Sequence, residues 1–254
     1  MLLTIDIGNS NIVCVVYSSE KERLYDARYE TLKENIKSAY KEFVEKQILP
    51  LKDKYNLEAF IVSSVVPSVD QVFFETVETC LEIKGYKCTT DTVSEFEILL
   101  NNPKELGADF IATSYGALCK YNTPMIVAYL GSATKLSAIN SEGQFAGGII
   151  MPGLRISQDA LNRFIPHLPT IPLEIPKSVL GIDTITAMQA GLMFSTIDSI
   201  SGIANRIEDE FNEKCTKILT GGLSILIKDH TESFIYEPFL LNDGLFEIYL
   251  KFVK

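Results

Sequence analysis

The first eighteen residues constrain the fold of this chain more than any other segment. They contain two short apolar runs, Leu2–Ile7 and Ile12–Tyr17, separated by the tetrapeptide Gly8-Asn9-Ser10-Asn11. Short runs rich in β-branched residues, on either side of residues that favour chain reversal, predict two strands joined by a tight turn. We therefore expect the chain to begin with a β-turn-β unit.

Asp6 lies near the end of the first predicted strand, beside that turn. A carboxylate at this position can hold a hydrated Mg²⁺ ion, and the N–H and hydroxyl groups of Gly8, Asn9, Ser10 and Asn11 can face phosphate oxygens. An ordinary hairpin with a polar turn accounts for the same residues. The turn by itself leaves both interpretations open.

Length, composition and charge limit the kinds of protein that this chain can be. Its 254 residues, 46% hydrophobic and 22% charged, fit one large or two smaller globular domains with a sizeable core. The net charge of −10 argues against nucleic acid or an anionic membrane as the main partner. The five cysteines form no C-x-x-C or Cys/His cluster, which predicts free thiols rather than a zinc site. No apolar run reaches the ~18 residues of a membrane span and no export signal is apparent, so we expect a cytoplasmic protein.

The apolar pattern of the first half predicts strands that alternate with helices after the first hairpin. Beyond the first hairpin we expect strands at Arg23–Tyr29, Ala59–Val66 and Tyr86–Thr89, and helices at Thr31–Ile48 (ended by Pro50), at Pro67–Ile83 and from Leu106 to Tyr121.

The same pattern then starts again. The second half is expected to contain strands at Met125–Leu130, Lys135–Asn140, Gln144–Ile150, Lys217–Leu219 and Phe234–Tyr236, and helices at Pro152–Phe164, Thr184–Glu213 and Asn242–Phe252. This order indicates an internal duplication of architecture, with an N-terminal lobe over residues 1–117 and a C-terminal lobe over 118–254.

Two similar lobes predict a cleft between them that takes a nucleotide. Each lobe would supply one phosphate-binding turn, Asp6–Asn11 in the first and Gly131-Ser132-Ala133-Thr134 in the second. A third turn, Thr220-Gly221-Gly222, follows a predicted strand, and its glycines allow a base or ribose to approach the backbone. Three such turns in this order are stronger evidence than any one of them.

Seven short motifs are distributed over nearly the whole chain. They are D-I-G-N-S at Asp6–Ser10, S-S-V-V-P at Ser63–Pro67, N-N-P-K-E-L-G-A-D at Asn101–Asp109, L-G-S-A-T at Leu130–Thr134, G-G-I-I-M-P-G at Gly147–Gly153, T-I-T-A-M-Q-A-G at Thr184–Gly191 and T-G-G-L at Thr220–Leu223. Together they resemble the type III pantothenate kinases of the actin/hexokinase/Hsp70 ATPase-domain superfamily. The resemblance implies an α/β fold of two RNase H-like, actin-like ATPase lobes, with mixed sheets flanked by helices.

The same resemblance implies an activity, cofactors and partners. Such enzymes phosphorylate pantothenate with Mg-ATP in the first step of coenzyme A biosynthesis. They require a monovalent cation, K⁺ or NH₄⁺, and work as homodimers in which the dimer interface contributes to the pantothenate pocket.

Individual roles follow from matching positions. Asp6–Val13 match the family's first phosphate motif, with Asp6 holding Mg²⁺ through water. Gly107, Ala108, Asp109 and Phe110 match a pantothenate-binding segment, in which Asp109 falls on the general base that accepts the proton of the substrate hydroxyl group. Ser132 falls on an ATP-binding threonine and Thr184 on a substrate-contacting threonine. Without the resemblance, Asp109 would be interpreted as a carboxylate that stabilises a helix N-terminus.

Four positions depart from the family pattern. Phe110 replaces an arginine, Tyr129 replaces the aspartate that binds the monovalent cation, Lys135 replaces a threonine, and Leu100 replaces a tyrosine. In one interpretation the ammonium group of Lys135 substitutes for the cation and the kinase is active without it. In the others the chain is an impaired subunit that pairs with a complete paralogue as a heterodimer, or a nucleotide-binding accessory protein.

Overall fold

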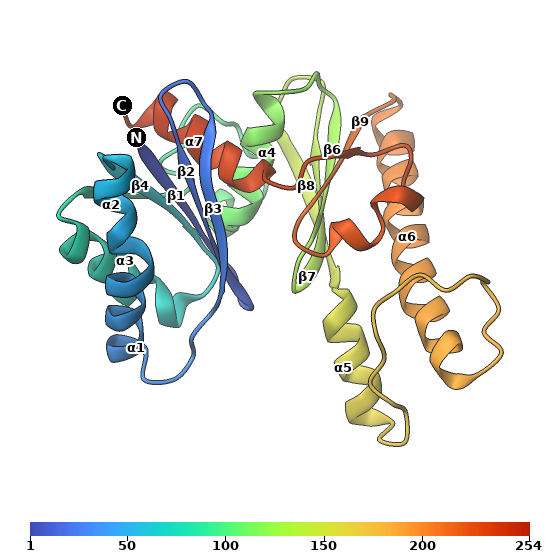
Figure 1. The fold of residues 1–254 in the computed structure, drawn as a ribbon. Coiled ribbons are helices and arrows are strands. Elements are labelled where there is room, and N and C mark those ends of the chain that lie inside the picture. Colours follow the sequence, from blue (N-terminus) through green and yellow to red (C-terminus); the bar gives the residue numbers. More distant parts are fainter. The chain divides into compact units, whose positions relative to one another are not determined.

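The computed structural model of the protein describes residues 1–254, which fall into two units. Unit 1 contains residues Met1–Phe96, Asn101–Cys119 and Leu240–Lys254, and unit 2 contains residues Glu97–Leu100 and Lys120–Phe239. Each unit is a sheet with helices packed against it (Figure 1). The short segment Glu97–Leu100 enters unit 2 first, and the main passage into unit 2 follows Cys119, near the expected boundary at 117/118. The final helix, expected in the second lobe, instead belongs to unit 1.

The sheet of unit 1 has the strand order β3-β2-β1-β4-β5. β1 pairs antiparallel with β2 and parallel with β4, β2 pairs antiparallel with β3, and β4 pairs parallel with β5. All residues of β1 are buried, as is typical of a strand whose sheet is covered on both faces. The strands are β1 (Leu2–Ile7), β2 (Asn11–Tyr17), β3 (Arg23–Glu30), β4 (Ala59–Ser64) and β5 (Lys84–Lys87).

Helices α1 (Ile36–Phe43), α2 (Leu49–Tyr55) and α3 (Pro67–Leu81) cover one face of this sheet (Figure 1). Alternate residues of β1 point into the core beneath them, together with Tyr40 of α1 and Phe73 of α3, whose rings meet edge to face.

The other face carries α4 (Ala108–Leu118) and α7 (Leu240–Phe252). Asn242 donates a hydrogen bond from Nδ2 to Thr4 Oγ1 at 3.1 Å, and the buried hydroxyl of Tyr17 donates to Asp243 Oδ1 at 2.5 Å. α7 also crosses α4 at Gly244, where a Cβ atom would overlap the carbonyl oxygen of Ala112. These contacts explain why the last helix packs in unit 1.

The helix expected at Thr31–Ile48 is wrong at both ends. It begins at Ile36, because Thr31 is hydrogen-bonded to the turn that follows β1. Pro50 does not end the helical segment, because a π-helical turn at Val44–Ile48 leads from α1 into α2. Pro50 lies in the first turn of α2, where a proline is tolerated because the backbone N–H groups of a first turn make no hydrogen bond within the helix.

The sheet of unit 2 repeats the topology of unit 1. Its order is β8-β7-β6-β9-β10, with β6 antiparallel to β7, β7 antiparallel to β8, β6 parallel to β9 and β9 parallel to β10. Each of these pairings has its counterpart in unit 1, which confirms the internal duplication. The strands are β6 (Met125–Leu130), β7 (Ala133–Ile139), β8 (Phe145–Pro152), β9 (Thr216–Thr220) and β10 (Ile235–Tyr236).

Two helices, α5 (Leu154–Phe164) and α6 (Thr184–Phe211), belong to unit 2. α6 buries Met193, Ile200 and other apolar residues against the sheet, and Asp183 caps its N-terminus by accepting from the N–H of Thr186. Short 3₁₀ turns complete the fold at Pro103–Glu105 in unit 1 and at Ser224–Leu226 and Lys228–His230 in unit 2. None of the helices combines the length and the apolar character that a membrane crossing requires.

Candidate active site

A row of three side chains crosses the sheet of unit 1 at the carboxyl ends of its parallel strands. Asp6 of β1 is paired in register with Ser63 of β4. Cys88 follows β5 directly and continues the row, because Val62 is paired with Lys87 and accepts a hydrogen bond from the N–H of Cys88. Residues paired side by side on neighbouring strands point to the same face of a sheet. Asp6, Ser63 and Cys88 therefore share the face that α4 and α7 cover.

The N-terminus of α4 adds a second carboxylate to this row. Cys88 Sγ lies 3.7 Å from the carbonyl oxygen of Ala108, and Asp109 follows in the first turn of the helix. Asp109 Oδ1 accepts the backbone N–H of Phe110 at 2.8 Å. Gly107 leaves room for this carboxylate, since a Cβ there would lie 2.9 Å from Asp109 Oδ1. Asp6 and Asp109 are only 7% and 5% exposed.

The charges of the two carboxylates raise the pKa of one thiol, that of Cys88. Burial raises the pKa of Cys88, and the negative charges of Asp109 and Asp6 raise it further. Burial and the charge of Asp6 also raise the pKa of Cys14 to about 12. Both cysteines therefore stay neutral, and Cys88 lies in the row of Asp6 as well as beside the first turn of α4, which carries Asp109.

The turn after β1 is closed by hydrogen bonds and held by a residue that the sequence alone did not reveal. Gly8 N–H donates to the carbonyl of Asn11 at 2.9 Å. Thr31 donates from Oγ1 to the carbonyl of Gly8 at 2.7 Å, and its N–H donates to the carbonyl of Ser10 at 3.1 Å. Asn9 and Ser10 are exposed at the tip. The turn thus presents polar groups on a fixed backbone, as phosphate binding requires.

In unit 2, three glycine-containing turns meet around Leu130. The carbonyl of Leu130 accepts the N–H of Leu223 at 3.0 Å. Gly221 has φ +96°, and a Cβ there would lie 2.5 Å from Leu130 O. At the start of α5, a Cβ on Gly153 would overlap the carbonyl oxygen of Ser132. Only glycine permits this close approach of the three segments.

Tyr129 and Lys135 are neighbours beside these turns. They are paired across β6 and β7, and Lys135 Nζ lies 5.9 Å from the centroid of the Tyr129 ring. The ring also lies against Gly131, where a Cβ would be 2.6 Å from Tyr129 Cε1. A phenol ring beside an ammonium group does not fit a site for a monovalent cation, because that site needs anionic oxygen ligands and no competing positive charge.

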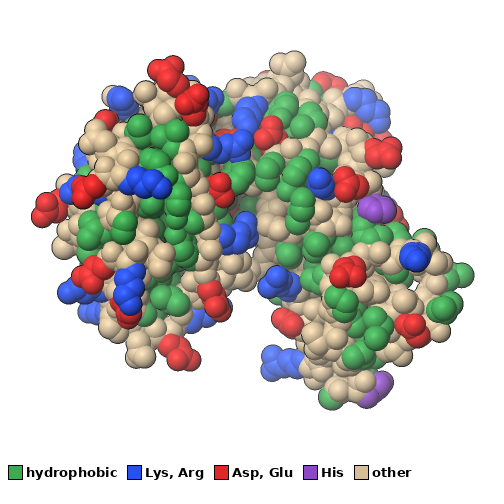
Figure 2. All heavy atoms as spheres, viewed as in Figure 1, with side chains coloured by type: hydrophobic (Ala, Val, Ile, Leu, Met, Phe, Trp, Pro, Cys, Tyr) green, Lys and Arg blue, Asp and Glu red, His purple; other side chains and the backbone are tan.

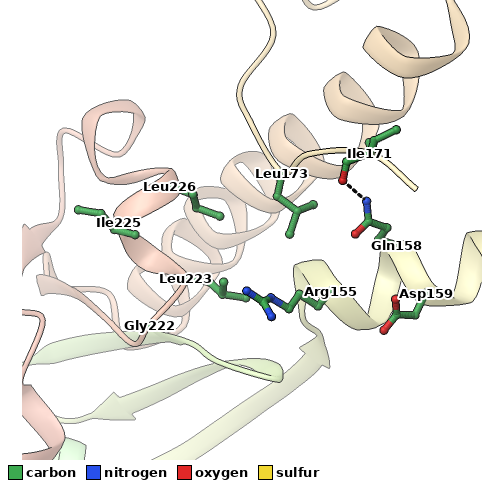
Figure 3. A pocket seen from close by; sticks show the side chains of 9 residues that line it. All are labelled: Arg155, Gln158, Asp159, Ile171, Leu173, Gly222, Leu223, Ile225 and Leu226. Atoms are coloured by element: carbon green, nitrogen blue, oxygen red, sulfur yellow. Dashed lines mark hydrogen bonds between the residues drawn. The ribbon is translucent and has the colours of Figure 1, made fainter. Parts of the chain in front are cut away.

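A cavity of about 620 Å³ adjoins the Gly221-Gly222 turn (Figure 3). In Figure 3 the guanidinium group of Arg155 points toward Gly222 and Leu223. Gln158 helps to shape the wall by donating from Nε2 to the carbonyl of Ile171 at 2.5 Å. The cavity is lined by Arg155, Gln158, Asp159, Ile171, Leu173, Gly222, Leu223, Ile225 and Leu226. Its lining combines five apolar side chains and a glycine with one cation, Arg155, and one anion, Asp159.

Comparison with known proteins identifies the family. A family model for type III pantothenate kinase matches residues 2–206. A type III pantothenate kinase from Bacillus cytotoxicus is 33% identical over 98% of this chain and 95% of its own length. The chain belongs to the type III pantothenate kinase family. It is thereby a phosphotransferase.

Solved structures support the fold of this pantothenate kinase family member. A protein from Campylobacter jejuni, named as a Baf family transcriptional activator, aligns with a TM-score of 0.61 at 18% identity over 98% of both chains. A ROK family glucokinase from Streptomyces griseus, solved with glucose and AMPPNP, aligns with a TM-score of 0.53 at 12% identity over 97% of both chains. The predicted fold class, two actin-like ATPase lobes with mixed sheets flanked by helices, is confirmed.

The predicted site residues of the kinase fall into two groups. Unit 1 brings together Asp6, the turn Gly8–Asn11 and the segment Gly107–Phe110. The ring of Phe110 is buried, and its backbone N–H donates to the carboxylate of Asp109. In unit 2 the glycine turns converge, whereas Thr184 lies at the exposed first position of α6 and does not line the cavity there.

The residues around Asp6 suit a hydrated Mg²⁺ ion. The carboxylate of Asp6 and the hydroxyl of Ser63 are oxygen groups, which this cation prefers, and they are adjacent in the sheet. Asp6 would hold the metal through its water shell, and the metal would neutralise phosphate charge.

Proposed function

We propose that this kinase phosphorylates pantothenate with ATP to give 4′-phosphopantothenate, the first step of coenzyme A biosynthesis. The observation that supports this most directly is the buried Asp109 carboxylate in the first turn of α4, beside the row that contains Asp6. A carboxylate beside a candidate metal-binding carboxylate can serve a reaction in which a hydroxyl group attacks a phosphorus atom.

In the proposed reaction, Asp109 accepts the proton of the primary hydroxyl group of pantothenate as its oxygen forms a bond to the γ-phosphorus of ATP. The bond from that phosphorus to the bridging oxygen breaks, and ADP leaves with its electron pair. The hydrogen bond from Phe110 N–H to Asp109 Oδ1 fixes the carboxylate in one orientation. Gly107 and Ala108 present their backbone to the substrate beside it.

We assign ATP binding to the turns. Asn9, Ser10 and Asn11 bind phosphate oxygens through N–H and side-chain groups, and Gly8 closes the turn through its hydrogen bond to the carbonyl of Asn11. In unit 2 the ATP-binding residues are Gly131, Ser132, Gly221 and Gly222. We assign the adenosine group to the cavity beside Gly222, where the guanidinium group of Arg155 points toward the turn.

We propose that the kinase does not need a monovalent cation. The position of the family's cation-binding aspartate holds Tyr129, and the ammonium group of Lys135 stands next to its ring. In this proposal Lys135 supplies the positive charge that the cation would supply, and phosphate oxygens are its partners.

We also propose that the active form is a homodimer. Apolar side chains gather where α5 and the start of α6 lie in unit 2 (Figure 2). Leu180 and Ile182, just before α6, are 81% and 95% exposed, and Val179 and Ile185 are exposed as well. A patch of this kind favours association. Thr184 lies within it, which supports a substrate-contacting role for Thr184 once a second copy covers the patch.

The experiment is a turnover assay on the purified isolated chain with pantothenate and Mg-ATP. We expect 4′-phosphopantothenate by mass spectrometry, at the same rate with and without K⁺ or NH₄⁺. Sedimentation analysis of the same sample should give the mass of a dimer, and Leu180→Glu should give a monomer.

A folded chain that binds ATP and forms no product would contradict the proposal. It would favour the impaired-subunit alternative, which the loss of an arginine at Phe110 motivates. Adding a paralogue that carries Gly-x-Asp-Arg would then be expected to yield activity. ATP binding without activity in either assay would favour an accessory protein.

A further inference from the structure

One buried hydroxyl group in the row has no partner within the protein. Ser63 is 0% exposed, and its Oγ makes no hydrogen bond to any protein atom. Buried hydroxyl groups are normally hydrogen-bonded, because desolvation without a compensating bond costs free energy. An unpartnered hydroxyl at a candidate site therefore needs an explanation.

The surroundings of Ser63 point to Asp6. The two residues are paired in register on adjacent parallel strands, so their side chains lie next to each other on the same face. The other neighbour in the row is Cys88, a buried thiol and a weak hydrogen-bond partner. Among the groups in this row, the carboxylate of Asp6 is the strong acceptor.

We propose that Ser63 is a positioning residue for Asp6. When Mg-ATP is bound, the hydroxyl group of Ser63 donates a hydrogen bond to the Asp6 carboxylate and holds it toward the water shell of the Mg²⁺ ion. This inference rests on the proposed function, because it requires that Asp6 takes part in Mg-ATP binding. It adds to that function a residue whose role is to fix the direction of the carboxylate.

The chain offers a matched control. Ser114 of α4 is also 0% exposed, and its Oγ likewise makes no hydrogen bond to protein. It lies outside the row of Asp6, Ser63 and Cys88. Ser63→Ala and Ser114→Ala therefore remove the same chemical group from equally buried positions of the same unit.

The experiment measures ATP binding by calorimetry, with Mg²⁺ and with EDTA, and thermal unfolding of the free protein. We expect Ser63→Ala to weaken Mg-ATP binding about tenfold, as loss of a hydrogen bond to a charged group does, and to leave binding in EDTA unchanged. Ser63→Thr, which keeps a hydroxyl group, should restore the native affinity. Ser114→Ala should match the native protein in both conditions, and neither alanine variant should lower the melting temperature.

Three outcomes would overturn the inference. Ser63→Ala could bind Mg-ATP as tightly as the native protein, or Ser114→Ala could weaken binding as much, which would mean that packing alone is involved. A native protein whose ATP binding does not depend on Mg²⁺ would remove the role of Asp6 and the inference with it, before any variant is made. Ser63→Cys, with nearly the same volume and a weaker donor, provides the same comparison if the alanine variant does not fold.

Discussion

The two units share a strand order and differ in the residues that the order places at equivalent positions. Asp6 of β1 pairs with Val13 and Ser63. The equivalent residue of β6, Tyr129, pairs with Lys135 and Thr220. Duplication has thus kept the backbone pairing, whereas the carboxylate of Asp6 corresponds to the phenol ring of Tyr129, and Val13 corresponds to the cation Lys135.

Because of this difference, the candidate site of unit 1 is acidic, whereas the turns of unit 2 have basic side chains beside them. The candidate site of unit 1 holds two buried carboxylates, Asp6 and Asp109, which suit a metal ion and a proton acceptor. Unit 2 holds Lys135 beside its turns and Arg155 beside its cavity, which suit the charge of a nucleotide. Substitution of the proton acceptor Asp109 should therefore change turnover, and substitution of Lys135 should change nucleotide affinity.

The largest effect is expected for Asp109→Asn. Without a proton acceptor the rate should fall by about 10²- to 10⁴-fold, while ATP affinity stays within about twofold. Steady-state kinetics and calorimetry would measure the two quantities. Asp70→Asn is the control, because Asp70 lies in the first turn of α3. Equal, small changes in turnover for both variants would mean that Asp109 only stabilises its helix.

Acid should lower the stability of unit 2, because it protonates Glu208 of α6. Burial tends to raise the pKa of this carboxyl, but hydrogen bonds from Cys215 N–H, Lys214 and Lys217 outweigh it and lower the pKa to about 2. In the unfolded chain the same carboxyl has the ordinary glutamate pKa of 4.5. The stability that Glu208 contributes is therefore fully present above pH 4.5 and is lost as the pH falls toward 2.

Glu208→Gln should consequently lower the free energy of unfolding at pH 7 by about 1–3 kcal/mol. It should also abolish most of the decrease in this free energy between pH 5 and pH 2. Hydrogen exchange should show the loss in α6 and β9 rather than in β1. Glu210→Gln, an exposed position on the same helix, is the control. If the two variants unfold alike at every pH, the lysines around Glu208 do not stabilise unit 2.

A smaller effect is expected for Lys135→Met. Loss of the ammonium group should weaken ATP binding about tenfold and leave the rate at saturating ATP nearly unchanged. Lys228→Met is a matched control, because Lys228 Nζ lies 5.6 Å from the Tyr236 ring, much as Lys135 lies 5.9 Å from that of Tyr129. Calorimetry that finds the same affinity for both variants would contradict a phosphate-binding role for Lys135.

The sequence predicted what local patterns determine. The strands of both sheets were found because apolar runs and turn residues alternate along the chain, and the repeat of that pattern predicted the shared topology. The sequence order predicts the final helix in the second lobe, and this is wrong, because the packing of the helix depends on the close contact between Gly244 and Ala112, which are distant in sequence.

Local sequence patterns also predict part of the candidate site. Asp6, its turn and Asp109 stand in recognisable motifs. The role that we infer for Ser63 depends on its register with Asp6, and Arg155 became a candidate only when α5 met the turn at Gly222. Neither relation is visible in the order of residues, because each joins segments brought together by tertiary packing.

The smallest effect should separate the two phosphate-binding turns. The turn of unit 1 is held by Thr31, which donates from Oγ1 to the carbonyl of Gly8 at 2.7 Å, whereas in unit 2 the turn is held by close backbone packing at Gly153. Thr31→Val keeps the shape of the side chain and removes this bond, so the free energy of unfolding should fall by about 1 kcal/mol.

Thr76→Val is the control, because Thr76 Oγ1 donates to the carbonyl of Val72 at 2.6 Å within α3. Both variants should lose similar stability in urea, but only Thr31→Val should weaken ATP binding, by about threefold, because only its bond fixes the backbone of a phosphate turn. Equal ATP affinities would mean that the turn after β1 keeps its shape without Thr31, and that side-chain support does not distinguish it from the turn in unit 2.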